Sequence, residues 1–362
     1  MKRTRDCPAS RLKSFEIWNC LDRDLRRELI KDICAGMKNS HKCIPSKYFY
    51  DTYGSRLFER ICQTPEYYPT RTELSILSRR GAEIARFFSR RPGNLIELGS
   101  GSNKKVRKLL DAATPSQRHN IRYVPVDISQ SALVKAAEEL GRLYGDLDIL
   151  GIVADFTRHM SIVPAGRKLI LFLGGTIGNF GEHEARSMLQ SIAAIMGNED
   201  LFLMGIDLLK PVEALEAAYN DAQGITRDFN LNILSVINKE LNADFDLRDF
   251  EHWAFFNPAK ERIEMHLRAR RACTVFISDL SMKVDFRESE TIHTEICRKF
   301  SRESADRMFR EAGLSVTRWL TDPKEWFALV ELRLDERRRK PDRPLIPHRL
   351  PGLKCGRGCD AM

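Results

Sequence analysis

Five short apolar runs alternate with segments of helical spacing, and this alternation restricts the possible fold more than any other feature of the sequence. Runs of this length, rich in β-branched and apolar residues, are typical of parallel strands buried on both faces. The expected strands are Asn94–Leu98, Tyr123–Asp127, Ile149–Asp155, Lys168–Gly174 and Asp200–Asp207. The expected helices between them are Lys104–Ala112, Ser131–Leu143 and Glu182–Ala194. The pattern predicts a doubly wound, Rossmann-like α/β sheet.

A long insertion follows the fifth expected strand. The alternation stops after Asp207 for about 90 residues, and then a helix over Ser301–Ala312 and strands over Leu314–Thr321 and Phe327–Leu334 are expected. Structureless connections of this length are uncommon, so the insertion is expected to form a second domain. Arg11–Met37 has helical character and lies more than 50 residues before the first expected strand, so we expect it to join that domain.

The excess positive charge lies at the two ends of the chain. The net charge is +9, of which Met1–Lys13 contributes +4 and Arg337–Met362 contributes +6, leaving −1 for the body. A nucleic-acid enzyme usually carries a basic face on its folded domain, so the composition argues against a nucleic-acid partner. We expect both basic tails to be disordered.

The cysteines and the apolar segments indicate the compartment. Nine cysteines, an odd number, are scattered along the chain, and no apolar segment follows the basic N-terminus. This usage is typical of a cytoplasmic protein with reduced thiols. The longest apolar stretches, near Leu169–Leu173 and Leu201–Leu209, fall far short of the roughly 20 residues that cross a bilayer, so no membrane segment is expected.

Two glycines come directly after the first expected strand, within Glu97–Asn103. Ligands of open α/β sheets bind beyond the carboxyl ends of the strands, and Gly99 and Gly101 would let a ligand approach the backbone closely. The third glycine of the dinucleotide pattern is missing, since position 104 is Lys, which argues against a dehydrogenase. An ordinary strand-to-helix turn remains the alternative.

Acids stand at the ends of the next two expected strands. Asp127, 28 residues after Gly99, is suited to accept hydrogen bonds from the two ribose hydroxyls of a nucleoside, and Asp155 from an adenine amino group, with Phe156 beside the ring. The combination favours S-adenosylmethionine (SAM) over NAD. Asp127 as a helix N-cap is the open alternative.

The segment Gly174–Asn179, after the fourth expected strand, lies where an acceptor would face the cofactor. It contains no Pro-Pro-Tyr, which argues against enzymes that methylate the amino groups of nucleic-acid bases. Asn179 offers donors and an acceptor to a small polar substrate. A tight turn with a buried structural Asn is the alternative.

Five of the eight tyrosines fall within residues 48–68. Rings with hydroxyls suit a pocket for an amine that becomes a quaternary ammonium, because ring faces attract cations. An aromatic seam between domains is the alternative. No metal site is expected, because His-Glu-x-x-His and paired Cys-x-x-Cys motifs are missing and Cys355 and Cys359 stand alone in a tail. A Gly-x-Ser-x-Gly elbow is missing as well, so nucleophilic hydrolysis has no support.

Together these motifs resemble the histidine-specific, SAM-dependent Nα-methyltransferases that make hercynine, the betaine precursor of ergothioneine. The resemblance extends from Pro45 to Leu334, and the string Pro65–Glu73 is its most specific part. The other strings that carry it are Tyr50-Asp51, Gly54-Ser55, Glu97–Gly101, Gly174–Asn179, Tyr219–Thr226, Phe229-Asn230, Asn242–Leu247, Phe250–His252, Arg262–Met265 and Thr294-Glu295.

The resemblance implies a class I methyltransferase fold with an antiparallel closing strand and an inserted substrate-binding domain. Residues 74–209 and 300–335 would bind SAM, residues 14–73 and 210–299 would bind substrate, and residues 1–13 and 336–362 would be the tails. It also implies a monomer acting on the small molecule L-histidine.

By position, the resemblance implies cofactor contacts at Tyr50, Gly99, Lys105, Asp127, Asp155 and Phe156. The implied substrate contacts are Tyr67, Asn179, Tyr219, Met265, Glu295 and Cys297. Asn179 and Tyr219 would hold the α-carboxylate and amine, and Glu295 and Cys297 the imidazole. Tyr50 and Asn179 would orient the amine, and no general base is assigned.

Two positions depart from the resemblance: Cys297 and Gly175 stand where Ser is common. Both departures concern substrate choice rather than methyl transfer. At Cys297 the hydrogen bond to the imidazole ring is weakened, because a thiol is a poorer hydrogen-bonding group than a hydroxyl. Glu295 favours histidine over an indole, which would leave the carboxylate unpaired. The alternatives are an N-methyltransferase of another aromatic or imidazole amine, a non-catalytic nucleoside-binding regulator and, against the charge pattern, a nucleic-acid methyltransferase.

Overall fold

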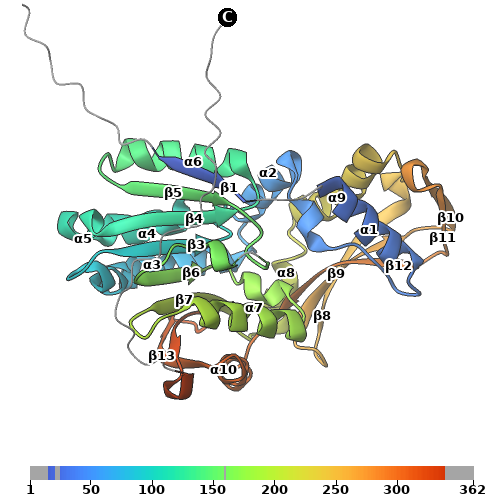
Figure 1. Ribbon diagram of the computed structural model, residues 1–362. Coiled ribbons are helices and arrows are strands. Elements are labelled where there is room, and N and C mark those ends of the chain that lie inside the picture. The colour runs from blue at the N-terminus through green and yellow to red at the C-terminus, as the bar shows by residue number, and fades with distance from the viewer. Residues whose placement is uncertain (1–14, 21–24, 159, 339–362) are drawn as a thin grey trace, which may run out of the picture.

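An eight-stranded sheet forms one side of the molecule in the computed structural model, which describes residues 15–20, 25–158 and 160–338 (Figure 1). The strand order is β1-β5-β4-β3-β6-β7-β14-β13, and β14, which is antiparallel to both β7 and β13, runs opposite to the other strands of this sheet. The bounds are β1 Glu16–Asn19, β3 Gly93–Leu98, β4 Ile121–Asp127, β5 Asp148–Val153, β6 Lys168–Phe172, β7 Leu201–Asp207, β13 Leu314–Thr321 and β14 Phe327–Leu334. The predicted doubly wound α/β sheet with an antiparallel closing strand is confirmed.

Helices cover both faces of this sheet because successive side chains of each strand point to opposite faces. Leu95 packs with α3, α4 and α6, whereas its neighbour Ile96 packs with α7 and α10. The α-helices of the described residues are α1 Leu25–Lys38, α2 Thr52–Ile61, α3 Tyr68–Ala85, α4 Lys104–Ala112, α5 Pro115–His119, α6 Gln130–Leu143, α7 Glu182–Ile195, α8 Val212–Ala217, α9 Ile225–Leu241 and α10 Arg302–Glu311. The two apolar layers fix the carboxyl ends of the parallel strands along one edge.

The N-terminal part of the chain corrects one expectation. Helical character was expected over residues 11–37, but Glu16–Asn19 forms strand β1, which pairs in parallel with the edge strand β5. Gly151 makes room for this pairing, since a Cβ there would lie 2.5 Å from Ile17 Cδ1. Residues 16–19 therefore belong to the large sheet rather than to the second domain, and α1 begins only at Leu25.

A second region contains a four-stranded sheet, β2-β12-β9-β8, and a two-stranded sheet, β10-β11 (Figure 1, right). One apolar cluster joins these strands to α1, α2, α8 and α9. A β-bulge lies between His293 and Glu295 in β12. The bounds are β2 Lys42–Cys43, β8 Phe250–Asn257, β9 Arg262–Ala269, β10 Cys273–Ile277, β11 Met282–Phe286 and β12 Thr291–Arg298.

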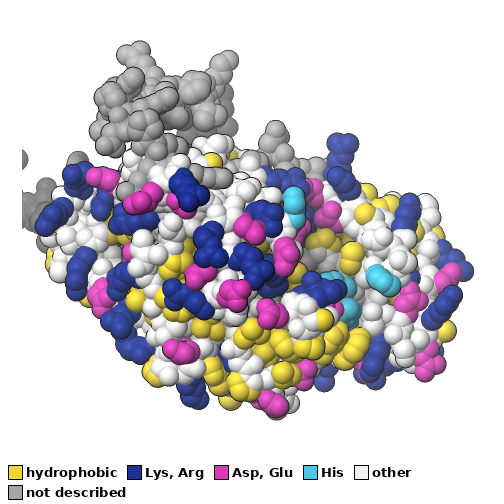
Figure 2. Space-filling view, turned by 90° about the horizontal axis from the view of Figure 1, so that it is seen from below, with side chains coloured by type: hydrophobic (Ala, Val, Ile, Leu, Met, Phe, Trp, Pro, Cys, Tyr) yellow, Lys and Arg dark blue, Asp and Glu magenta, His cyan; other side chains and the backbone are white. Residues whose placement is uncertain are grey.

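The described residues include little of the two basic tails. The expected basic tails lie outside the described residues, apart from residues 336–338. Basic and acidic side chains are interspersed over the face that Figure 2 shows. Among the described residues, no helix is long and apolar enough to cross a membrane.

Candidate functional site

The glycine turn after β3 brings three strand ends together. Gly99 and Gly101 have left-handed φ values of +67° and +48°, which favour glycine. A Cβ at Gly99 would lie 3.4 Å from the Phe156 ring, which follows β5. The Gly101 amide donates to Asp127 Oδ2 at 3.2 Å, at the end of β4. The backbone conformation of the turn therefore favours glycine at both positions, and the turn contacts Asp127 and lies beside Phe156, two of the predicted cofactor residues.

The acids at the strand ends take part in local hydrogen bonds. Asp127 Oδ1 accepts from the Ser129 amide at 3.0 Å, and Ser129, not Asp127, is the N-cap of α6. The N-cap alternative for Asp127 is therefore wrong. Asp155 Oδ1 accepts from the amide and hydroxyl of Thr157 at 2.9 and 2.5 Å.

Lys105, another predicted cofactor residue, pairs with Glu73, a buried acid to which the sequence analysis assigned no role. Its Nζ lies 2.8 Å from Glu73 Oε2, and both carboxylate oxygens accept from the Gly174 amide at 2.8 and 3.0 Å. Glu73 is 0% exposed, and Gly205 makes room for it, because a Cβ there would lie 2.2 Å from Oε1. The last residue of the Pro65–Glu73 string thus ties α3 to α4 and to the loop after β6.

A further buried acid lies on β3 itself. Glu97 accepts a hydrogen bond of 2.5 Å from the Tyr123 hydroxyl. Burial raises the pKa of Glu97 to about 7, although Tyr123 and Lys105 act in the opposite direction. The residue is part of the glycine string but was given no role from the sequence.

Aromatic rings from separate segments form a continuous series. The ring of Tyr50 lies 5.6 Å from that of Phe58, Phe58 lies 6.2 Å from Tyr67, and Tyr67 lies 6.3 Å from Tyr219, all edge to face. Phe229 of α9 packs against Tyr50 at 5.7 Å. The structure therefore brings together the three tyrosines predicted for the site, as one aromatic wall.

Local hydrogen bonds position Tyr50 at the start of α2. Asp51 is the N-cap of this helix and accepts from the Gly54 amide at 2.7 Å and from Asn232 Nδ2 at 2.8 Å. Gly54 is required here, since a Cβ would lie 1.7 Å from the Phe49 carbonyl oxygen. These contacts explain the Tyr50-Asp51 and Gly54-Ser55 strings, and the Tyr50 ring packs against Phe58 of α2 and Phe229 of α9.

Asn179 and Glu295 meet across the two regions of the chain. Asn179 ends the 3-10 helix η4 (Thr176–Asn179), and its Nδ2 donates to Glu295 Oε1 of β12 at 3.1 Å. Burial raises the pKa of Glu295 to about 7, and Lys299 partly offsets this rise. Met265 of β9 is the direct cross-strand partner of Glu295. Three of the predicted substrate residues are therefore adjacent.

A buried charge network that the sequence did not predict lies beneath these residues. Lys299 Nζ, on a residue that is 2% exposed, lies 2.8 Å from Asp207 Oδ2, 3.2 Å from the Tyr219 hydroxyl and 3.1 Å from Cys297 Sγ. Asp207 also accepts from Tyr68 at 2.7 Å and pairs with Lys210 at 2.5 Å.

Burial and the neighbouring charges shift the pKa values of Lys299, Lys210 and Asp207 in this network. Burial alone would lower the pKa of Lys299, but the Asp207 carboxylate raises it well above its ordinary value. Burial lowers the pKa of Lys210 to about 8, with Asp207 opposing. Burial alone would raise the pKa of Asp207, but both ammonium groups hold it below its ordinary value. Lys299 is therefore a fixed cation in contact with Tyr219 and Cys297.

The backbone conformation at position 175 favours glycine. Its φ is +67°, and a Cβ there would lie 3.4 Å from the Phe327 ring and 3.7 Å from Asp207 Cβ. A Ser at this position would therefore contact β14 and the network at Asp207.

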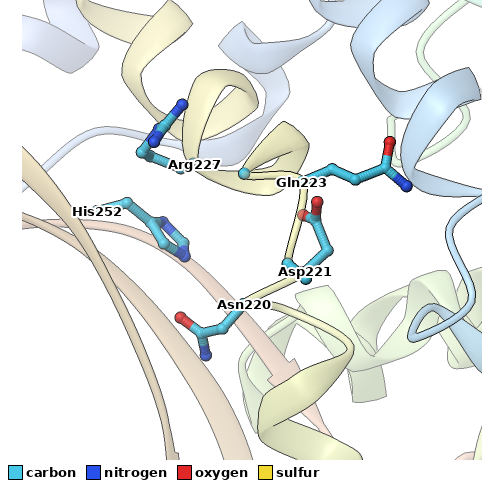
Figure 3. Close-up of a pocket in the computed structure, with 7 residues that line it drawn as sticks. Asn220, Asp221, Gln223, Arg227 and His252 are labelled. Atoms are coloured by element: carbon cyan, nitrogen blue, oxygen red, sulfur yellow. The ribbon is translucent and has the colours of Figure 1, made fainter.

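The segment that carries Tyr219 borders a cavity of about 270 Å³ (Figure 3). Residues 220–224, Arg227 and His252 line it. His252 Nε2 lies 2.9 Å from the Tyr219 carbonyl oxygen, and its Nδ1 lies 2.9 Å from Asn230 Nδ2. Burial lowers the pKa of His252, so the neutral ring donates to the carbonyl and accepts from the amide. The cavity therefore lies beside the segment of Tyr219, and His252 binds the backbone of this predicted substrate residue.

The chain is similar in sequence, over most of its length, to known proteins. Residues 29–334 match the family described as "Histidine-specific methyltransferase, SAM-dependent". A histidine N-alpha-methyltransferase of Mycolicibacterium smegmatis is 42% identical over 87% of this chain and 98% of its own length. Ergothioneine biosynthesis protein 1 of Neurospora crassa is 28% identical over 78% of this chain and 32% of its own length. An L-tryptophan methyltransferase of Psilocybe serbica is 28% identical over 81% of this chain and 88% of its own length.

Proposed function

The chain belongs to the histidine-specific, SAM-dependent methyltransferase family, and on this premise we propose that it trimethylates the α-amine of L-histidine to hercynine, the first step of ergothioneine biosynthesis. The resemblance drawn from the sequence is thereby confirmed at the level of the family. The observation that carries the proposal is the pair Asn179–Glu295, which joins an amide at the end of the large sheet to a carboxylate from the inserted region.

The residues at the strand ends suit the nucleoside part of SAM. Gly99 leaves a space beside Phe156 that a Cβ would fill, and Asp127 and Asp155 stand at neighbouring strand ends. SAM supplies a methyl group on a positively charged sulfur, which is already an activated donor. Lys105, in its ion pair with Glu73, fixes the loop at Gly174.

The acceptor side would hold histidine at both ends. Asn179 and Tyr219 bind the α-carboxylate and amine, and Tyr50 and Asn179 orient the amine toward the methyl group. Glu295 and Cys297 face the imidazole, with Tyr67 and Met265 beside it. Because the pKa of Glu295 is about 7, its carboxyl group can share a proton with an imidazole near neutral pH.

Positioning accounts for most of the proposed catalysis. The neutral amine attacks the methyl carbon in line, the carbon–sulfur bond breaks, and solvent takes each proton, so no general base is assigned. Holding two reactants in such a geometry can be worth about 7–11 kcal/mol. The aromatic wall of Tyr50, Tyr67 and Tyr219 attracts the positive charge of the methylated amine.

A second candidate is the methylation of another aromatic or imidazole amine. Cys297 and the similarity to the tryptophan enzyme favour it. The Lys299 ammonium, 3.1 Å from Cys297 Sγ, changes the polarity at this position in a way that the sequence did not indicate. A non-catalytic regulator would bind SAM without turnover.

We further propose a cytoplasmic monomer that acts on a small molecule rather than on nucleic acid. The six cysteines among the described residues are all free thiols, which supports a reducing compartment. In this proposal residues 25–73 and 210–299 bind substrate, and residues 16–19, 74–209 and 300–335 bind SAM.

The variants Asn179→Ala and Glu295→Ala test the proposed substrate site, with Glu288→Ala on the exposed surface as the matched control. A hydrogen bond to a charged group is worth about 1.5–3 kcal/mol, so kcat/KM for histidine should fall about 10- to 150-fold in each variant. SAM affinity, measured by calorimetry, should stay within about twofold. Unchanged turnover of histidine in both variants would refute the assigned roles.

A further inference from the structure

A second group of ionisable side chains lies on the face of the four-stranded sheet opposite the proposed substrate site. Glu264 and His266 of β9 and His293 of β12, here called the histidine–glutamate cluster, bring their ligand atoms within 4.8 Å of one another. His293 is the cross-strand partner of His266. The sequence predicts no metal site, because it lacks His-Glu-x-x-His and paired Cys-x-x-Cys motifs.

The bulge in β12 creates this arrangement. In a regular strand, His293 and Glu295 would face the same side. The irregularity between them lets Glu295 pair with Met265 on one face, while His293 pairs with His266 on the other. Ile263, Met265 and Leu267 pack into the apolar cluster with α9, so the alternate residues of β9 form the opposite face.

The cluster is largely removed from water and has unpaired nitrogen atoms. The side chains of Glu264 and His266 are 10% and 12% exposed, and Glu264 Oε2 lies 3.3 Å from His266 Nε2. His266 Nδ1 and His293 Nε2 are buried without a hydrogen-bond partner. Since buried polar atoms are nearly always paired, the unpaired His293 Nε2 in a cluster that also holds His266 Nε2 and Glu264 Oε2 requires an explanation.

Neighbouring side chains hold the cluster in place. The Phe255 ring stacks on His266 at 5.7 Å, Trp253 lies 5.5 Å from His266, and the two imidazoles are 4.9 Å apart. Arg262 Nη2 and Asn257 Nδ2 both bind Glu264 Oε1, at 2.8 and 3.0 Å. The positive charge of Arg262 is thus directed at one carboxylate oxygen, while the other faces the imidazole.

We propose that Glu264, His266 and His293 form a binding site for a divalent transition-metal ion, with Zn²⁺ as the ion that fits best. Two imidazoles and a carboxylate are ordinary Zn²⁺ ligands, and the 3.3 Å between Oε2 and Nε2 equals the ligand–ligand edge of a tetrahedron with bonds of about 2.0–2.1 Å. Arg262 and Asn257 supply the outer hydrogen bonds that orient the carboxylate. A bound ion would link β9 to β12 directly behind Met265 and Glu295.

Equilibrium dialysis of the full-length chain against Zn²⁺, with reduced thiols and without free histidine, tests this site. The wild type should retain one Zn²⁺ more than His266→Gln, His293→Gln or Glu264→Gln, and binding at this site should weaken at least about 100-fold. All variants keep the nine cysteines, so thiol binding cancels in the comparison. His183→Gln, on the exposed surface of α7, is the matched control and should bind like the wild type.

Fluorescence locates the ion independently. Co²⁺ should quench emission from Trp253, and this quenching should disappear in Trp253→Phe and in Glu264→Gln. Circular dichroism without metal checks that each variant is folded. If a histidine variant is unfolded, the comparison of the wild type with Glu264→Gln, the most conservative change, tests the proposal. Equal Zn²⁺ retention by the wild type and a folded Glu264→Gln, or no Trp253 quenching in the wild type, would overturn the proposal.

Discussion

The buried pair of Lys299 and Asp207 gives the sharpest stability prediction. In Lys299→Met, Asp207 keeps the Tyr68 hydroxyl at 2.7 Å and Lys210 at 2.5 Å, so its charge remains compensated. The variant loses one charge-assisted network, worth about 1.5–3 kcal/mol of unfolding free energy. Asp207→Asn leaves two buried ammonium groups without a carboxylate and should cost more, about 3–5 kcal/mol.

Urea unfolding followed by circular dichroism measures both free energies. The control is Lys239→Met. The Lys239 side chain is 80% exposed and forms a surface ion pair of 3.5 Å with Glu240, and such pairs contribute at most about 1 kcal/mol to the free energy of unfolding. Lys299→Met should also raise KM for histidine, since the Tyr219 hydroxyl loses a donor at 3.2 Å. The reasoning is refuted if Asp207→Asn is milder than Lys299→Met, or if Lys299→Met matches the control.

Three further predictions concern packing, pH and substrate choice. Gly205→Ala should destabilise the fold by about 1–3 kcal/mol, since the new Cβ would lie 2.2 Å from Glu73 Oε1, whereas Gly141→Ala, with nothing within 4 Å in a helix, should stabilise it by up to about 1 kcal/mol in the same urea assay. Because burial raises the pKa of Glu295 from 4.5 to about 7, this residue binds more protons in the folded than in the unfolded state between these values, so its contribution to stability should fall as pH rises through this window. Compared with Glu295→Gln, the wild type should lose more stability between pH 4.5 and 7.5, and this difference removes the contributions of Glu97, which has the same sign, and of His252, His266 and His293, whose lowered pKa values have the opposite sign. An identical pH dependence of the two unfolding midpoints would contradict the assignment. Cys297→Ser should lower KM for histidine about 2- to 10-fold by supplying a better hydrogen-bonding group, and a raised KM in steady-state assays would count against imidazole recognition at this position.

Local patterns in the sequence predict the large sheet well. Lys104–Ala112, Leu314–Thr321 and Phe327–Leu334 have the bounds expected from apolar spacing alone. Strand β1 is missed because four residues carry too little periodicity, and its stability comes from pairing with β5 and from the space at Gly151.

The sequence predicts that certain residues of the candidate site come together, but it does not predict the electrostatics of the site. The resemblance implies roles for Tyr50, Asn179 and Glu295, and the fold brings the last two within 3.1 Å. The role of Lys299 depends on Asp207, 92 residues away, and no local pattern encodes such a contact. The histidine–glutamate cluster likewise depends on the bulge in β12, which only the pairing of strands reveals.

Mass spectrometry of the purified chain with SAM, in separate reactions with each of the twenty amino acids and histamine, tests the proposed function most directly. The account predicts that histidine gains three methyl groups, while tryptophan and histamine gain none. Turnover confined to another amine would contradict the proposed substrate, and SAM binding without any methyl transfer would contradict the proposed enzyme.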